Sequence, residues 1–108
     1  MDDYPPYPPE LDTADWQAAF NEAEVDPACV SEVLAMAEGE NDGDNWVGVF
    51  RTKGGAFLYV TAGCDYTGWD CQASGSHETR RTLEQLVREC CTDDDRRRLG
   101  LQLGTDVV

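Results

Sequence analysis

The residue types best suited to chemistry gather in the second half of the chain. Cys64 and Cys71 are separated by six residues, and the single histidine, His77, follows them. Thiolate and imidazole groups bind zinc, so these residues, with Cys90 or Cys91, outline a zinc-binding alternative. Across a hairpin, Cys64 and Cys71 could also lie close enough to form a disulfide. Strong zinc sites use Cys-x2-Cys spacings, which this chain lacks, so we expect small buried cysteines and no metal or other cofactor.

Two carboxylates and two aromatic rings lie between those two cysteines. Asp65, Tyr66, Trp69 and Asp70 are of the types that bind a sugar, or carry out acid–base catalysis when one carboxyl pKa is raised. Aspartates beside a turn more often accept backbone N–H bonds. The chain has neither a Gly-x-Ser-x-Gly nucleophile motif nor a phosphate-binding glycine loop with a lysine. We therefore expect a protein that is not an enzyme and has no catalytic residues.

The string Cys-Asp-Tyr-Thr-Gly-Trp-Asp-Cys-Gln, residues 64–72, resembles the core of small uncharacterised proteins of bacteria and their phages. The likeness covers roughly residues 46–100, including the acid-then-arginine segment from Thr92 to Gly100. It implies no established activity and leaves out the N-terminal half. From its residues, the string predicts a tight turn with Trp69 packed beneath it. The residues of this motif turn are Cys64, Asp65, Tyr66, Trp69, Asp70 and Cys71.

Charge divides the chain into two unequal halves. The first 50 residues contain 13 carboxylates and no Lys, Arg or His, whereas the rest contains nine acidic and eight basic residues. The formal charges are therefore −13 and −1, which add to −14. An asymmetry of this kind concerns association and not fold. A surface this acidic argues against direct binding to nucleic acid or to an anionic membrane, so the expected partner is a basic protein.

Duplex DNA carries about one charge per 1.7 Å of axis, so 13 carboxylates correspond to roughly 22 Å of duplex. The sequence therefore predicts an acidic interaction protein that binds a basic, nucleic-acid-binding protein in the manner of a DNA-mimic inhibitor. The resemblance to phage proteins favours this role without bringing an established activity with it. Two alternatives are an acidic surface that only aids solubility and a Cys/His zinc module. The expected partner-binding residues are Asp15, Glu22, Glu24, Glu32, Glu38, Glu40, Asp42 and Asp44.

The compartment is predicted from what the sequence contains. The N-terminus lacks the basic and apolar regions of a secretory signal, and no run approaches the roughly 20 apolar residues of a membrane span. Five cysteines, an odd number, suit a reducing environment. We expect a cytoplasmic protein.

The elements that position these residues are expected to form a single acidic α+β domain over residues 12–108. A flexible Tyr/Pro-rich arm over residues 1–11, with polyproline character, precedes it. Apolar residues at helical spacing, among them Trp16 and Phe20, predict a helix capped by Asp12 or Thr13. The same spacing predicts a second helix over residues 26–39, which completes an N-terminal helical hairpin.

Period-two patterning predicts strands over residues 46–50 and 56–62, the second of them central, and a third strand over 69–73. A C-terminal helix capped by Ser76 or Thr79 and a short final helix from Thr92 to Gly100 follow. The predicted fold is therefore a helical hairpin, a three-stranded antiparallel sheet, a C-terminal helix and a short final helix.

Overall fold

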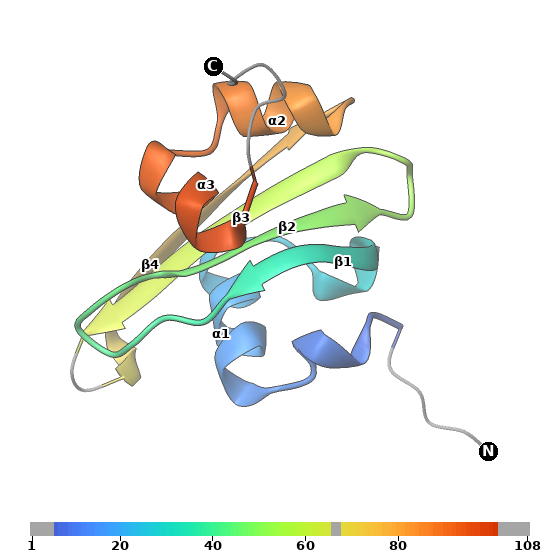
Figure 1. Cartoon of the computed structure of the whole chain (residues 1–108). Helices are drawn as coiled ribbons and strands as arrows, with labels where there is room; N and C mark the ends of the chain where they lie inside the picture. The colour runs from blue at the N-terminus through green and yellow to red at the C-terminus, as the bar shows by residue number, and fades with distance from the viewer. Residues whose placement is uncertain (1–5, 66–67, 102–108) are drawn as a thin grey trace.

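The computed structural model describes residues 6–65 and 68–101, without the side chains of residues 70–72. Among the described residues it is an α+β fold in which four antiparallel strands follow one another across a single sheet, in the order β1-β2-β3-β4 (Figure 1). The elements in chain order are η1 (Pro9–Leu11), α1 (Ala14–Glu22), η2 (Pro27–Cys29), β1 (Val30–Ala37), β2 (Trp46–Thr52), β3 (Phe57–Asp65), β4 (Gly68–Arg80), α2 (Leu83–Glu89) and α3 (Asp93–Leu99), where η denotes a 3-10 turn.

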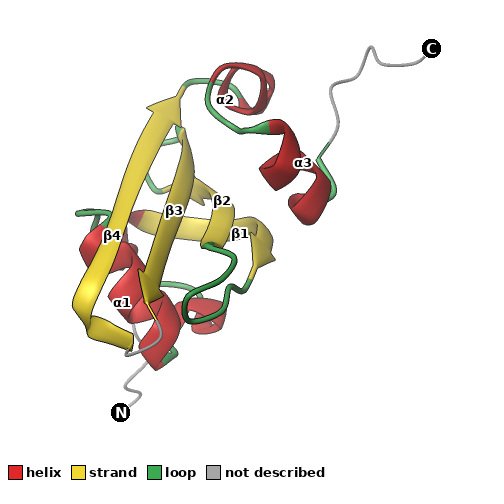
Figure 2. Cartoon of the chain, turned by 90° about the vertical axis from the view of Figure 1, so that its left-hand side faces the viewer, coloured by secondary structure: helices red, strands yellow, loops and turns green. Residues whose placement is uncertain are grey.

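Helices cover both faces of the sheet. Successive side chains of a strand point to opposite faces, so Leu58 and Val60 of β3 pack under α1 while Tyr59 packs under α2 and α3. Figure 2 shows α1 on one side of the sheet and the α2–α3 pair on the other. The expectation of a central strand that is apolar on both faces is confirmed for β3.

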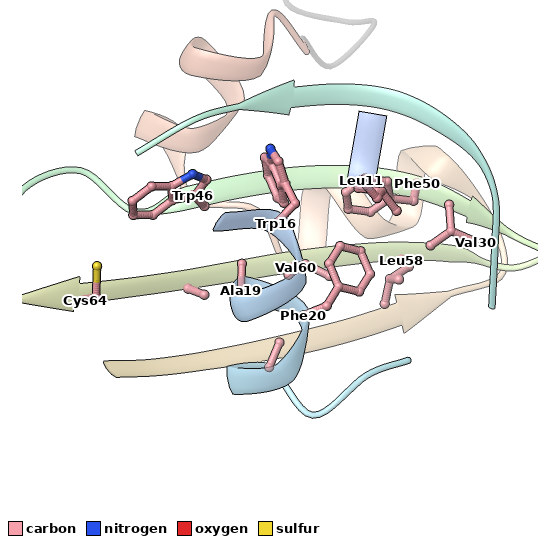
Figure 3. Packing of buried hydrophobic residues seen from close by; sticks show 12 residues of the cluster. Leu11, Trp16, Ala19, Phe20, Val30, Trp46, Phe50, Leu58, Val60 and Cys64 are labelled. Carbon is pink, nitrogen blue, oxygen red and sulfur yellow. The ribbon is translucent and has the colours of Figure 1, made fainter. Parts of the chain in front are cut away.

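An aromatic core joins α1 to the sheet (Figure 3). Thr13 begins the helix because its hydroxyl accepts a hydrogen bond from Trp16 N (3.1 Å), as expected for one of the two candidate caps. Phe20 meets Phe50 edge to face, with ring centroids 5.3 Å apart, and Trp16 meets Phe50 at 6.3 Å. Such pairs contribute about 0.5–1.5 kcal/mol each beyond the area they bury.

A second, smaller core lies under α2 and α3. The Tyr59 hydroxyl donates to the carboxylate of Asp95, which ties β3 to α3. Thr92 caps α3 by accepting a hydrogen bond from Asp95 N (3.0 Å), and Gly100 ends it with φ of 72°. The predicted final helix is confirmed.

The predicted second helix over residues 26–39, and with it the N-terminal helical hairpin, is wrong. Asp26 does act as a cap, since its Oδ1 accepts from Ala28 N (2.9 Å), but it opens only the single turn η2. The chain then enters strand β1, so the sheet begins at Val30.

Two register shifts explain why β1 resembles a helix in sequence. They fall between residues 30 and 32 and between residues 33 and 35 of its pairing with β2. Each shift adds a residue to one strand, so Val30, Val33 and Met36 pack against the α1 core at a spacing of three. Leu34 packs against the opposite core. A strand with two bulges thereby reproduces the apolar spacing of a helix.

The three-stranded sheet is likewise wrong, because the sheet has a fourth strand and its last strand is longer than predicted. Residues 74–80, which we expected to form a turn and the start of a helix, belong to β4 and pair with residues 57–63. Consequently neither Ser76 nor Thr79 is the cap of α2. Thr82 takes this role, with its hydroxyl accepting from Gln85 N (3.1 Å).

The described part of the N-terminal arm contacts the domain. The Lys53 ammonium donates to Pro6 O (2.7 Å), Tyr7 packs against the α1 core, and Leu11 is fully buried in it. Residues 6–11 therefore lie along the domain and share its core.

Candidate interaction surface

The eight expected partner-binding carboxylates occupy three places. Asp15 and Glu22 lie on α1, with Glu24 just beyond its end, and Glu32 lies on β1. The other four belong to the connection between β1 and β2, residues 38–45, which we call the acidic loop. Seven of the eight are exposed and Glu22 is half-buried.

The acidic loop is closed at its base. Glu40 N donates to Asp44 O (2.9 Å), and the backbone passes so close to Gly39 that a side chain there would collide with the main chain of residues 44–46. Arg98 of α3 reaches across and donates to Glu38 O (3.1 Å) and Asn45 O (2.8 Å). The loop is thus fixed through its backbone, while its carboxylates point into solvent.

The acidic loop also contacts the end of β3. Asp42 N donates to Cys64 O (2.8 Å), and the Cys64 thiol donates to Asn41 Oδ1 (3.2 Å). An open hollow of about 320 Å³ lies beside this contact and is lined in part by Asp42 and Asp65.

Asp15 approaches the same end of the molecule from α1. Its Oδ1 accepts a hydrogen bond from Trp69 Nε1 (3.0 Å), and the Trp69 ring lies against Trp46 with centroids 4.9 Å apart. Burial raises the pKa of the Cys64 thiol, and the nearby charges of Asp15 and Asp65 raise it further. Asp15, Asp65 and the acidic loop therefore form one acidic end.

Glu24 and Glu32 lie away from the acidic end. Glu24 ends α1 with φ of 62°, in a motif where Val25 N donates to Phe20 O (3.1 Å). Glu32 pairs in register with Arg51 at the other end of β2. The eight residues are therefore not one stripe, and the structure brings five of them together: Asp15, Glu38, Glu40, Asp42 and Asp44.

The two halves of the chain differ in whether their carboxylates form ion pairs. Within the described residues every salt bridge joins partners between Glu78 and Arg97, such as Glu84 with Arg88 (3.0 Å) and Asp94 with Arg97 (2.9 Å). None of them includes a carboxylate of the first half. The charge of the first half is therefore not neutralised by the described basic residues.

The basic run of α3 is used within the molecule. Arg96 donates to Val87 O (3.3 Å) and Cys91 O (3.1 Å), Arg97 pairs with Asp94, and Arg98 holds the acidic loop. Arg98 is the site residue that sequence reasoning missed. The helix dipole already accounted for a basic residue at that position, so no signal remained to indicate its contact with the loop.

The zinc candidates do not meet in the described structure. Cys64 packs under α1, and His77 Nδ1 contacts Ala23 O (2.7 Å) on the same face, whereas Cys90 and Cys91 pack under α2 on the opposite face. No group of three or more potential ligands that could hold a metal occurs among the described residues.

The motif turn is only partly described. Tyr66 and the side chains of Asp70 and Cys71 lie outside the described residues, so the pairing of Asp65 with Asp70 stays a prediction. The suggested disulfide at Cys64 is not formed, because Cys64 is a free thiol. Trp69 packs on Trp46, next to the turn. The string therefore has a structural role at the acidic end through Trp69.

No family model, curated protein or solved structure matched this chain. No helix of the described residues is long and apolar enough to cross a membrane.

Proposed function

We propose that this chain is a non-enzymatic interaction protein whose acidic surface binds a basic, nucleic-acid-binding protein, in the manner of a DNA mimic. The observation that carries the proposal is the lack of ion pairs between first-half carboxylates and the described basic residues, in contrast to the pairing between residues 78 and 97. Seven exposed carboxylates, none of them in a salt bridge among the described residues, leave a field that attracts a cationic surface.

The acidic end is the expected centre of this surface. Its loop is held by Arg98 and by the close approach at Gly39, so the backbone that carries the carboxylates is ordered before binding. A surface organised in advance loses less conformational entropy on association. Complementary charge mainly accelerates encounter, so binding should be fast and should weaken with salt.

The test is affinity capture from a cell lysate at two salt concentrations, with identification of the retained proteins by mass spectrometry. The proposal predicts a nucleic-acid-binding protein that is retained at about 0.1 M salt and lost at about 0.5 M, where screening shortens the reach of surface charges. Capture of no basic protein at either concentration would contradict it and favour an acidic surface that only aids solubility.

Two matched variants make the capture specific to the acidic loop. The first, Glu38→Gln, Glu40→Gln, Asp42→Asn and Asp44→Asn, should lose the partner. The second, Glu78→Gln, Glu84→Gln, Asp93→Asn and Asp94→Asn, removes the same number of charges from paired positions and should retain it. Equal retention by both variants would place the interface elsewhere.

A further inference from the structure

Strand β1 forms one edge of the sheet, and its outer side pairs with no other strand of the described residues. It pairs with β2 on its inner side, and within the described residues no backbone hydrogen bond links the outer side of residues 31–37 to another element. Proteins normally protect such an edge with charges, prolines, bulges or a covering element, because its free N–H and C=O groups can pair with another strand.

The chemical protection of β1 is weak next to the acidic loop. The run from Val33 to Ala37 has no charged residue and no proline. The two register shifts protect the beginning of the strand, but Ala35, Met36 and Ala37 pair regularly with residues 47–49. The unprotected part of the edge therefore ends where the acidic loop begins.

The side chains on this part of the strand lie at the margins of both cores. Met36 packs against the α1 core and Leu34 against the α2–α3 core, and both remain half-buried. A further strand beside β1 would place its alternate side chains on these two faces, so apolar residues at every second position would extend one of the two cores.

The opposite edge of the sheet is different. Residues 74–80 of β4 include Glu78 and Arg80, and Ser74, Ser76 and His77 are exposed polar residues. Charged and polar side chains of this kind discourage strand addition by apolar segments. The two edges are thus unequal, and β1 is the one suited to pairing.

Charge selects the occupant of the β1 edge. The exposed carboxylates of Glu38 and Glu40 come just after the strand, and the exposed Glu32 lies near its beginning. We infer that the edge of β1 binds an extended segment of the basic partner, with apolar residues alternating with Lys or Arg, as a fifth strand of the sheet. This inference rests on the proposed function and adds its binding mode: the acidic loop attracts the cationic residues and β1 pairs with the backbone.

The probe is a capped synthetic peptide that alternates lysine and valine, with four lysines and three valines. The control peptide replaces each valine by proline, which keeps the charge and removes the N–H groups that a ladder needs. The inference predicts that the valine peptide binds at least about tenfold more tightly than the proline peptide at low salt. It also predicts slower hydrogen exchange at the amides of residues 35–37 when the valine peptide is bound.

A pair of variants locates the binding at one edge. Ala37→Lys places a like charge on β1 and should weaken binding of the valine peptide by about tenfold. Ser76→Lys places the same charge on β4 and should leave the affinity within a factor of about two of the unchanged chain, because only long-range charge acts there. If the Ala37→Lys variant folds poorly, hydrogen exchange at residues 35–37 of the unchanged chain, with and without the valine peptide, still tests the inference.

Equal affinity for the two peptides, or no protection at residues 35–37, would overturn the inference. The proposed function would survive that outcome if Glu38→Gln with Glu40→Gln weakens both peptides alike, since binding would then depend on charge alone. If neither peptide binds, the edge inference also fails, and the capture experiment decides the proposed function separately.

Discussion

The acidic loop and the α2–α3 segment are both rich in carboxylates but use them differently. In the α2–α3 segment, carboxylates lie within 3.0 Å of guanidinium groups, as in Glu84–Arg88 and Asp94–Arg97. In the acidic loop the carboxylates are exposed and form none of the salt bridges found among the described residues. The contrast teaches that the first set contributes to local structure, whereas the second set is available to another molecule.

One residue links the two regions. Arg98 belongs to α3 but bonds the backbone of the acidic loop at Glu38 O and Asn45 O. The paired region therefore orders the unpaired one without neutralising its carboxylates.

The first half should depend on apolar packing, since its charges add little to folding. Phe20 is fully buried between Trp16 and Phe50, so Phe20→Ala should lower the free energy of unfolding by about 3–5 kcal/mol in urea denaturation. The control Asn21→Ala removes an exposed neighbour and should change it by no more than about 0.5 kcal/mol. A loss below about 1 kcal/mol for Phe20→Ala would show that this core is not what holds α1.

Arg98 should matter more than its neighbour in sequence. Arg98→Ala removes two charge-assisted hydrogen bonds to carbonyl groups and should cost about 1–3 kcal/mol. Arg97→Ala removes an exposed ion pair and should cost at most about 1 kcal/mol. Hydrogen exchange of the Glu40 amide should accelerate only in the Arg98 variant. Equal effects from both variants would remove the link between the two regions.

The C-terminal ends of α1 and α3 allow the two regions to be compared at one backbone position. Glu24 and Gly100 occupy equivalent positions with φ of 62° and 72°, a conformation that costs a side-chain residue about 1 kcal/mol. Glu24→Gly should therefore stabilise the chain by up to about 1 kcal/mol, and Gly100→Ala should destabilise it by a similar amount. Thermal unfolding of the two variants measures both signs. Destabilisation by Glu24→Gly would mean that the Glu24 side chain supports the fold.

The smallest expected effect is a loss of stability at alkaline pH that arises in the α2–α3 core. Burial, together with the smaller effect of the Asp95 charge, raises the pKa of the Cys91 thiol from an ordinary value of 9.0 to about 11. The folded state thus favours the protonated thiol, so its stabilising contribution is complete below about pH 9 and is lost as the pH rises toward 11. The difference in unfolding free energy between the unchanged chain and Cys91→Ala should shrink between pH 9 and pH 11. A constant difference would contradict this environment for Cys91.

Local sequence signals correctly predicted the elements whose pattern is compatible with only one type of secondary structure. The Thr13 cap with a helical stripe gave α1, and the Thr92 cap with Gly100 gave α3. Strand β3, apolar on both faces, was predicted as central because a strand buried on both sides needs no alternation.

Tertiary pairing decided the elements that were predicted wrongly. The doubly shifted strand β1 places Val30, Val33 and Met36 on one face, which sequence periodicity cannot distinguish from a helix. Residues 74–80 of β4 lack apolar alternation because the end of α1 comes so close to their backbone that it leaves no room for a side chain at Gly75. There, a side chain at Gly75 would come within 2.8 Å of Ala23 N.

The sequence predicted which residues belong to the candidate site but not how they are arranged in space. The convergence of Asp15 on the acidic loop depends on the packing of α1 against β3 and β4, and the contact of Arg98 joins residues more than 50 positions apart. No local pattern encodes either contact.

The central claim is that the carboxylates of the acidic loop do not serve the fold and remain free to attract a partner. The most direct test is the free energy of unfolding, at low salt, of the variant Glu38→Gln, Glu40→Gln, Asp42→Asn and Asp44→Asn, compared with the unchanged chain. The account predicts equal or greater stability, because like charges about 4 Å apart repel by about 1 kcal/mol in water and Asn tolerates the φ of 58° at position 42. A loss of more than about 1 kcal/mol would show that the loop carboxylates stabilise the fold and would contradict the claim.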